Sequence, residues 1–388
     1  MSKSIREAVI VAYGRSAIGR AMKGALKDTH PVDYAAEVLC GVLNKVPQLS
    51  KEDIDDVMIG CSTPQGKMGC NMARLIVLRS GLPVSVPGQT INRFCSSGLQ
   101  SIATAANAIM AGQAEVIIAG GVETMSRESM AFDEDFKNNW LVENDTNAYM
   151  LMGMTAENVA KKYNVPRERM DTFALESHQK AHAAQQSGKF VGEIIPVMAT
   201  QEDGSSVPFA EDQGIRPNAT LESLAGLQSP FMEDGNVTAG TSSQLSDGAA
   251  MVVLMSREKA EALGIRPIAR FVGFAVAGVD PAYMGIGPVE SIPKVMKQTG
   301  LSIADMDVIE LNEAFASQAL ACMDVLGIDP KKVNPNGGAI ALGHPLGGTG
   351  SILTCKALAE LARTGGKYAL ITMCIGGGMG GAGIFEML

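Results

Sequence analysis

Aromatic residues and long apolar runs are both scarce in this chain. Only 5% of its 388 residues are Phe, Trp or Tyr, although 46% are hydrophobic. No apolar run approaches the roughly 18 residues that a membrane-spanning helix needs, so we expect no transmembrane segment. The chain reaches an apolar segment at 8–11 almost at once, which leaves no room for a signal or transit peptide. We therefore expect a cytoplasmic protein.

Cysteine and histidine spacings typical of metal sites are also missing. The seven cysteines include no Cys-x-x-Cys pair and there are only four histidines, so a zinc or iron–sulfur site has little support. An odd number of cysteines in a chain without a predicted signal peptide is typical of reduced thiols. The formal net charge of −9 disfavours nucleic acid and anionic membranes as partners. A polyanionic ligand would need basic residues placed locally.

What the sequence does contain is an alternation of strand-like and helix-like patterns, which favours an α/β fold. Residues 8–11 and 57–60 are predicted strands. Apolar residues recur at helical spacing over 97–110, and a further predicted strand at 115–119 ends in Gly120-Gly121.

The C-terminal third repeats this order. The segment 307–311 resembles 56–60, a glycine-rich turn precedes another helical pattern, and the predicted strand 368–375 ends in glycines. We interpret the repetition as a duplicated β/α unit. Between the halves the composition changes to polar loops and short amphipathic helices, which predicts an insertion. The predicted divisions are an N-terminal half (1–120 plus 246–267), an inserted loop domain (121–245) and a C-terminal half (268–388).

Cys95 lies where an irregular segment turns into the predicted helix at 97–110. The first turn of a helix offers unpaired N–H groups and the positive end of the helix dipole, which stabilise a thiolate and lower the pKa of the thiol. A lone cysteine is more often a small buried apolar residue. The role of Cys95 therefore depends on the groups that the fold brings to it.

Three further candidates stand at strand ends or glycine-rich turns: Asn312, His344 and Cys374. Reactive groups in α/β sheets collect at the carboxyl ends of strands and at the helix N-termini that follow. The repeat places Cys95 and His344 at equivalent turns, so pairing of the two halves would bring them together. Singly, His344 could bond the backbone, Asn312 could close a turn and Cys374 could fill the core. Their joint occurrence favours one shared site.

The segment 378–383 matches G-x-G-x-x-G after a predicted strand. A dinucleotide site also needs a helix to follow this motif, and the five remaining residues are too few to form one. We therefore predict no dinucleotide cofactor.

The sequence is similar to the thiolases, and in particular resembles the 3-ketoacyl-CoA thiolases (acetyl-CoA acyltransferases) of fatty-acid oxidation. The segments that carry the resemblance follow the family's order over nearly the whole chain. They are 92–100, 238–243, 246–250, 312–315, 336–345 and 374–378. The resemblance implies a thiolase fold, in which two duplicated βαβαβαββ halves carry an inserted loop domain.

The resemblance also implies a role for each candidate. Cys95 would attack the 3-keto carbon of a 3-ketoacyl-CoA and carry the acyl group, while His344 takes the proton of the thiol. His344 and a water held by Asn312 would stabilise the enolate oxygen of the departing acetyl-CoA, and Cys374 would protonate its carbon. Backbone N–H groups of Cys95 and Gly376 would form a second oxyanion hole. Coenzyme A is then a substrate, and no metal or cofactor is expected.

Further side chains map onto positions that contact the substrate in the family. One set would contact CoA in the inserted domain: Arg216, Ser223 and Ser243. Met152 and Met284 would line the path of the pantetheine and acyl groups, and Phe315 would also contact the substrate. The guanidinium of Arg216 would supply the local positive charge that an acidic protein needs to hold CoA phosphates.

Two positions depart from patterns common in the family. Thiolases specialised for acetoacetyl-CoA usually carry a histidine where this chain has Leu151, which argues for a degradative enzyme that accepts longer chains. Gly348 stands where relatives often have Cys or Ala, and we expect no mechanistic effect. The alternatives are a biosynthetic thiolase that condenses two acetyl-CoA molecules, a ketoacyl synthase, and a non-catalytic acyl-CoA-binding protein. The resemblance also suggests a homodimer or homotetramer.

Overall fold

Strands from both ends of the chain form one mixed sheet whose two parts repeat the same order, apart from an extra edge strand, β4, in the N-terminal part. The order is β4-β3-β5-β8-β1 in the N-terminal part and β10-β11-β12-β9 in the C-terminal part. Each part has parallel neighbours at its outer side and antiparallel neighbours toward the middle. The computed structural model describes residues 6–128, 136–144 and 146–388. The strands of the two parts are β1 (Ala8–Arg15), β3 (Asp56–Gly60), β4 (Gln89–Ile91), β5 (Val116–Thr124), β8 (Ser246–Ser256), β9 (Ala269–Gly278), β10 (Val308–Leu311), β11 (Tyr368–Ile375) and β12 (Met379–Met387); the short β2 (Gly19–Arg20) pairs with β8.

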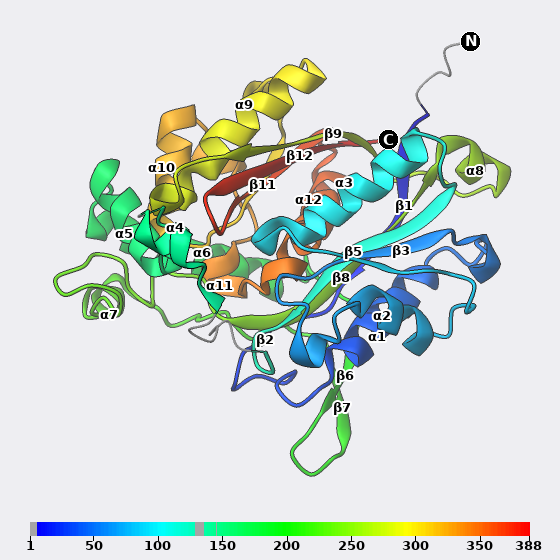
Figure 1. Ribbon diagram of the computed structural model, residues 1–388, viewed down its shortest axis with the longest axis horizontal. Helices are drawn as coiled ribbons and strands as arrows, with labels where there is room; N and C mark the ends of the chain where they lie inside the picture. Colours follow the sequence, from blue (N-terminus) through cyan, green and yellow to red (C-terminus); the bar gives the residue numbers. More distant parts are fainter. Residues whose placement is uncertain (1–5, 129–135, 145) are drawn as a thin grey trace.

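Two helices, one from each half, lie between the two parts of the sheet (Figure 1). They are α3 (Ser97–Met110) and α12 (Leu346–Thr364), and they contact each other directly. Glycines allow this close approach: a Cβ atom on Gly350 would stand 2.4 Å from the backbone nitrogen of Leu99. Among the described residues, the sheet itself joins the halves through two residue pairs of β1 and β9. The helix pair is therefore the main junction between the halves.

The apolar core forms three clusters, because both parts of the sheet are covered on both faces. In β1, Val9 and Val11 face the cluster on one side of the sheet, whereas Ala8 and Ile10 face the cluster around α3 and α12. A strand buried on both faces has no polar side, which explains why β8 is buried along its whole length. The outer layers are α1 (Pro31–Leu43), α2 (Met72–Arg79) and α8 (Arg257–Ala262) in the N-terminal half, and α9 (Gly287–Thr299) and α10 (Ala316–Leu326) in the C-terminal half.

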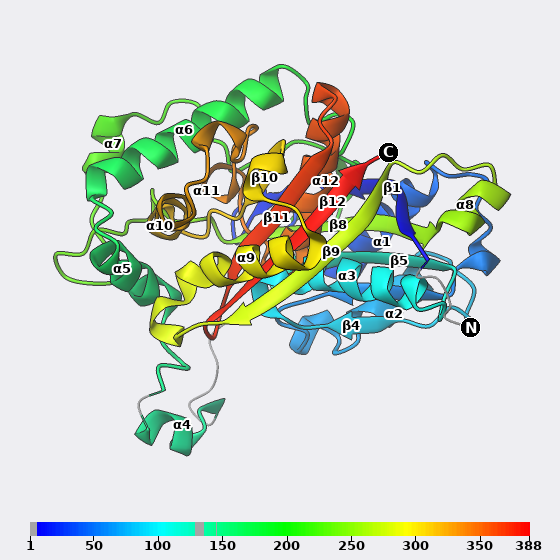
Figure 2. The ribbon, with the colours of Figure 1, turned by 90° about the horizontal axis from the view of Figure 1, so that it is seen from above.

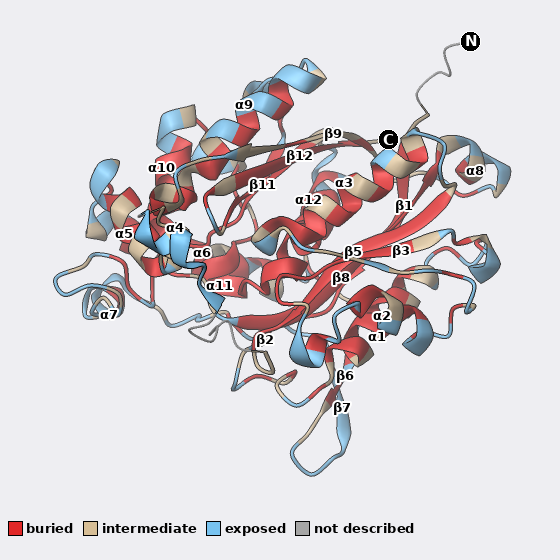
Figure 3. Cartoon of the chain, in the orientation of Figure 1, coloured by how far each residue is buried: buried red, intermediate tan, exposed pale blue. Residues whose placement is uncertain are grey.

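The segment between β5 and β8 packs against one end of this layered body, next to the short α11 (Ala339–Leu342) (Figure 2). Its long helix α6 contacts α10 and α11, and its helix α5 contacts α10. The core strands and α12 are buried, whereas α4, α7 and β7 are largely exposed (Figure 3). The elements of the segment are α4 (Asn139–Glu143), α5 (Met152–Lys162), α6 (Arg167–Gln186), β6 (Val197–Thr200), β7 (Ser206–Phe209) and α7 (Leu221–Ala225).

The expected α/β class and the duplication are confirmed, with two local corrections. The strand β5 does not end at Gly121 but continues to Thr124. The repeat is also shifted by one residue from the alignment of 307–311 with 56–60. The carboxylate of Asp55 accepts the N–H groups of residues 115 and 116, and the carboxylate of Asp307 accepts those of 367 and 368, at 2.7 and 3.0 Å in both halves. Asp307 is therefore the counterpart of Asp55.

No helix in the described part of the chain is long and apolar enough to cross a membrane.

Candidate active site

Cys95 is the middle residue of a single 3₁₀ turn, Phe94–Ser96, which runs directly into α3. Phe94 has a φ of 43°, a left-handed conformation that is strained for an aromatic residue. The Phe94 N–H donates to Asn92 Oδ1 at 2.8 Å, and the Ser97 hydroxyl donates to the Phe94 carbonyl at 2.6 Å. These local bonds hold the turn that presents Cys95.

The pKa of Cys95 is raised to about 11, so the prediction of a lowered value was wrong. Loss of solvent around the thiol is the largest cause, and the carboxylate of Glu123 adds to it. The N–H groups of Gly376 and of Cys95 itself act in the opposite direction without overcoming burial. Burial therefore outweighs the helix terminus, and Cys95 is a neutral thiol in the unliganded protein at pH 7.

Cys374 and Gly376 lie next to Cys95. The strand β11 contacts the turn that carries Cys95. The backbone N–H of Gly376, which follows this strand, acts to lower the pKa of Cys95, and the Cys95 thiol contributes to the high pKa of Cys374. Burial at the end of β11 is the larger cause of that high pKa. The structure thus brings two neutral thiols and one backbone donor together.

Asn312 and His344 form a second pair at the same end of the C-terminal half. The amide nitrogen of Asn312 lies 3.4 Å from His344 Nε2, and the hydroxyl of Thr349 lies 2.6 Å from His344 Nδ1. An amide nitrogen can only donate, so Nε2 accepts and Nδ1 carries the proton that points to Thr349. Burial lowers the pKa of His344 to about 4, so the imidazole is neutral and basic at Nε2 at pH 7.

The turns that carry Cys95 and His344 meet where α3 and α12 begin. A Cβ atom on Gly98 would stand 2.8 Å from the carbonyl oxygen of Gly347, and one on Gly121 would stand 2.2 Å from the same oxygen. Cys95 precedes Gly98 by three residues and His344 precedes Gly347 by three. The contact between the glycines therefore places the two turns side by side.

The Asn312 side chain also has a free acceptor. Its Oδ1 atom is buried and has no hydrogen-bond partner among the described residues. A buried acceptor without a partner costs roughly 1–3 kcal/mol. A water or a substrate donor bound beside His344 would remove this cost.

A cavity of about 460 Å³ lies in the inserted segment, and Ile340 of α11 is also among its lining residues. Two of the residues predicted to contact CoA, Arg216 and Ser223, line it, and Arg216 is exposed. Ser243 is not among its lining residues but directly precedes Gln244, which is. The carbonyl of Gln244 accepts the His344 N–H at 3.1 Å, so the wall of the cavity is bonded to the backbone of His344.

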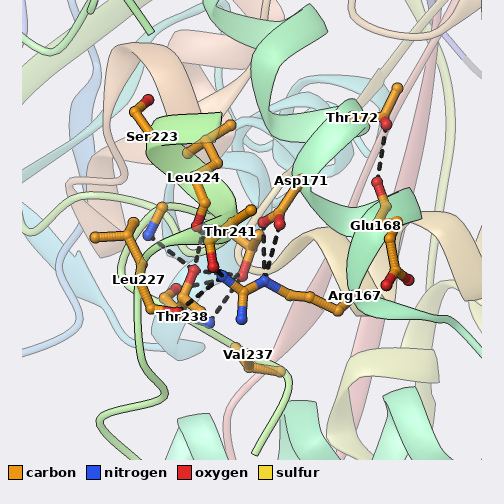
Figure 4. Close-up of polar contacts among 12 residues, drawn as sticks. Arg167, Glu168, Asp171, Thr172, Ser223, Leu224, Leu227, Val237, Thr238 and Thr241 are labelled. Atoms are coloured by element: carbon orange, nitrogen blue, oxygen red, sulfur yellow. Dashed lines mark hydrogen bonds and ion pairs between the residues drawn. The ribbon is translucent and has the colours of Figure 1, made fainter. Parts of the chain in front are cut away.

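Arg167 on α6 organises one side of this cavity (Figure 4). Its Nε lies 2.9–3.0 Å from the two carboxylate oxygens of Asp171. One terminal nitrogen donates to the carbonyls of Leu224 and Leu227 at 2.7 and 2.9 Å. Both leucines line the cavity, so Arg167 fixes the loop that forms its wall.

The other predicted substrate contacts differ in their surroundings. The Met152 sulfur lies 3.8 Å from the point where a Cβ on Gly376 would stand, close to the thiols. Phe315 is buried, with its ring packed edge-on against Phe231 at 6.2 Å between centroids. Met284 lies in the apolar core beside α9 and α10. The substrate-contact roles of all these residues stay predictions.

Sequence reasoning missed several residues of the site: Thr349, Gln244 and His178. His178 lines the cavity and accepts the Arg216 N–H at 3.2 Å, and burial lowers its pKa to about 4. Gln244 donates through its amide to the carbonyls of Gly214 and Ile340. The bonded partners of His178 and Gln244 are far apart in sequence, so no local sequence pattern could identify these two residues. Only the position of Thr349 in the glycine-rich turn was a usable signal.

Family models match nearly the whole chain. The model described as the N-terminal domain of thiolase matches residues 8–258, and the model described as the C-terminal domain of thiolase matches residues 265–387. These models divide the chain once, so the three-part division at 120, 245 and 267 stays a prediction.

Relatives and solved structures cover the chain over its length. It is 50% identical to a 3-ketoacyl-CoA thiolase of Bacillus subtilis, over 99% of this chain and 100% of that protein. It is 43% identical to the beta-ketothiolase BktB of Cupriavidus necator, again over 99% and 100%. The crystal structure of Bacillus anthracis acetyl-CoA acetyltransferase superposes with a TM-score of 0.93 at 41% identity, and human mitochondrial 3-ketoacyl-CoA thiolase with 0.90 at 39%. Both superpositions cover 100% of each chain.

Proposed function

Because this chain belongs to the thiolase family and is one of its acyltransferases, we propose that it is a 3-ketoacyl-CoA thiolase that works through an acyl-enzyme on Cys95. It would cleave a 3-ketoacyl-CoA with free CoA into acetyl-CoA and an acyl-CoA two carbons shorter. The observation that carries the proposal is the contact of β11 with the Cys95 turn, which brings Cys374 and the Gly376 N–H beside the Cys95 thiol. The Asn312–His344 pair supports it from the neighbouring turn.

The first half of the proposed reaction uses both neutral thiols. His344 Nε2 accepts the Cys95 proton as the sulfur attacks the 3-keto carbon, and the N–H groups of Cys95 and Gly376 receive the alkoxide. Collapse breaks the Cα–Cβ bond and leaves the acyl group on Cys95 and an acetyl-CoA enolate. The Cys374 thiol donates its proton to the enolate carbon. Losing one oxyanion donor typically costs about 10²–10³-fold in rate.

The second half restores both thiols. Cys374, now a thiolate, takes the proton of the CoA thiol as the CoA sulfur attacks the acyl-enzyme thioester. Cys95 leaves and recovers its proton from His344. All proton transfers involve side chains of this chain, so we propose that the reaction uses CoA as a substrate and needs no metal or further cofactor.

We place CoA in the 460 Å³ cavity, whose mouth holds the exposed Arg216. A guanidinium can form bidentate bonds with phosphate. Because Gln244 lines the cavity and is bonded to the His344 backbone, a pantetheine arm that follows this wall would lead toward the thiols. We further propose a homodimer or homotetramer.

The degradative direction rests on two observations. The Bacillus subtilis relative is named a 3-ketoacyl-CoA thiolase, and the apolar, exposed Leu151 precedes Met152 at the start of α5. An apolar residue beside the acyl path suits chains longer than acetoacetyl. The biosynthetic alternative, condensation of two acetyl-CoA molecules, is favoured by the name of the Bacillus anthracis neighbour, an acetyl-CoA acetyltransferase.

A rate profile across 3-ketoacyl-CoA chain lengths, with CoA as co-substrate, tests the proposal. We expect kcat/KM for 3-ketohexanoyl-CoA or longer substrates to exceed that for acetoacetyl-CoA. Strict specificity for the four-carbon substrate would instead favour the biosynthetic enzyme. Absence of turnover with every substrate, despite binding of acyl-CoA, would favour a non-catalytic binding protein.

A further inference from the structure

The backbone on both sides of His344 is bonded to buried carboxylates. Glu313 directly follows Asn312, and Glu123 lies near the end of β5 in the other half. They are 2% and 0% exposed. Neither forms an ion pair within the described ranges, and neither touches the thiols in the mechanism above. An ionised carboxylate costs several kcal/mol to bury, so such a group is stable only when several donors surround it.

Glu313 binds the segment that precedes His344. Its Oε2 atom accepts the Ile340 N–H at 3.2 Å and the Ser177 hydroxyl at 2.6 Å. The Ser177 hydroxyl in turn accepts the Gly338 N–H at 3.1 Å. The fit is close, because a Cβ on Gly338 would stand 2.2 Å from the Glu313 carboxylate carbon. The short helix α11, which leads to His344, is thus anchored at its start.

Glu123 binds the segment that follows His344. Its Oε2 atom accepts the Gly347 N–H and the Ser62 N–H, both at 2.8 Å. Its Oε1 atom accepts the hydroxyl and the N–H of Thr63 at 2.5 and 3.2 Å. Gly347 lies in the first turn of α12, where a carboxylate also interacts favourably with the helix dipole. The start of α12 is therefore fixed to the N-terminal half.

We propose that Glu123 and Glu313 are a pair of positioning residues, one from each half, that hold the His344 loop from both sides and so fix the direction of Nε2. His344 lies four residues after Ile340 and three before Gly347, between the two anchored points. The proposal rests on the proposed function, because it assumes that His344 is the base. A displacement of about 1 Å in such a group can lower a rate roughly 10²-fold.

The first experiment replaces each carboxylate. We expect Glu123→Ala and Glu313→Ala to lower kcat by roughly 10²-fold, with KM for CoA unchanged within about threefold. The Gln variants keep one oxygen that can accept from the loop, so we expect them to recover most of the activity. The matched control is Glu157→Ala. Glu157 is a buried carboxylate that accepts the Asn236 and Val237 N–H groups at 3.0 and 2.8 Å; we expect its removal to lower stability but not kcat.

The second experiment repeats each substitution in a His344→Ala background. If the carboxylates act through His344, their removal should then lower the residual kcat by less than about twofold, because the effects are not additive. A full additional loss in this background, or an equal loss of kcat in Glu157→Ala, would overturn the proposal while leaving the proposed function intact. Full activity of His344→Ala itself would overturn the assignment of the base, and this proposal with it. If an Ala variant does not fold, as judged by its unfolding midpoint, Glu123→Asp and Glu313→Asp carry the same cycle, because the shorter side chain withdraws the carboxylate from the loop.

Discussion

The Cys95 turn and the His344 turn occupy equivalent places in the two halves but are built differently. The Cys95 turn depends mainly on bonds within a few residues, from Asn92 and Ser97, and Cys95 is partly exposed. The His344 turn is buried and bonded to backbone and side chains about 100 or more residues away, such as Gln244 and Glu123. The difference matches the two roles that we propose, nucleophile for Cys95 and base for His344. A nucleophile must admit an acyl group, whereas a base must keep one ring nitrogen in one direction.

The sharpest test of this comparison removes the thiol that we propose as the nucleophile. We expect Cys95→Ser to lower kcat by roughly 10⁴-fold or more, as loss of a nucleophile does in other enzymes with covalent intermediates. Transfer of the acetyl group from acetyl-CoA to the protein, followed by mass spectrometry, should disappear. The control is Cys40→Ser, a change at a half-buried cysteine of α1. It should keep both the kcat of the parent protein and the transfer of the acetyl group. Acetyl transfer that survives in Cys95→Ser would show that another residue carries the acyl group.

The next test displaces the His344 turn without changing a reactive group. A Cβ on Gly347 would stand 2.7 Å from Cys61 Cα and from the Ser62 nitrogen, both backbone atoms that cannot move aside. We expect Gly347→Ala to lower kcat roughly 10²-fold and to destabilise the fold by about 1–3 kcal/mol. The measurements are steady-state kinetics and urea unfolding. Gly192→Ala, where a Cβ would meet nothing within 4 Å, is the control; equal kcat values for the two variants would contradict the account.

We expect a smaller effect on the kinetics from a substitution in the cavity wall, away from both turns. Arg167→Gln removes the charged bonds to Asp171 and weakens those to the cavity wall at Leu224 and Leu227. We expect KM for CoA to rise about tenfold, equivalent to about 1.4 kcal/mol, with kcat nearly unchanged. The exposed ion pair of Arg169 with Asp324 supplies the control, since Arg169→Gln should change neither constant. A fall in kcat in Arg167→Gln would mean that the cavity wall also sets the position of His344.

A last test, of stability and not of rate, separates the two turns by pH. The pKa of His344 is lowered to about 4 by burial, so the unfolded chain binds a proton more readily than the fold does. Stability from this group is present above about pH 6.5 and is lost as the pH falls toward 4, by about 2 kcal/mol at pH 5. Cys95, with a pKa of about 11, does not titrate in this window. Urea unfolding at pH 7 and 5 measures how much of the free energy of unfolding is lost at the lower pH. This loss should be smaller in His344→Asn than in the parent protein, and it should be unchanged in Cys95→Ser.

Local patterns predicted the elements well where the local and the tertiary environment agree. The helices 97–110 and 167–186 begin and end as their periodicity indicates. The end of β5 was missed because Glu123 and Thr124 read as polar residues beyond a strand, and only the contacts of Glu123 with the other half reveal why a carboxylate lies there. At the end of β5 a long-range contact therefore decided the outcome.

For the candidate site, too, the sequence indicated which residues are involved but not the properties that depend on distant parts of the chain. Motifs and the repeat identified Cys95, Asn312, His344 and Cys374 from sequence, and the structure brings them to neighbouring turns. The direction of the Cys95 pKa shift could not be predicted. It depends on how much solvent the opposite half removes from the thiol, which no sequence window around residue 95 contains.

The place of β1 in the sheet has a consequence for synthesis of the chain on the ribosome. This strand is made first, yet its sheet partners are β8 and β9, which begin at residues 246 and 269. At about 5–20 residues per second, on the order of 10 s pass between emergence of the first strand and of its partners. During that time the apolar edges of β1 and β5 are unpaired, a state prone to aggregation. The nascent N-terminal half is therefore a candidate client for a chaperone until residue 256 has left the exit tunnel.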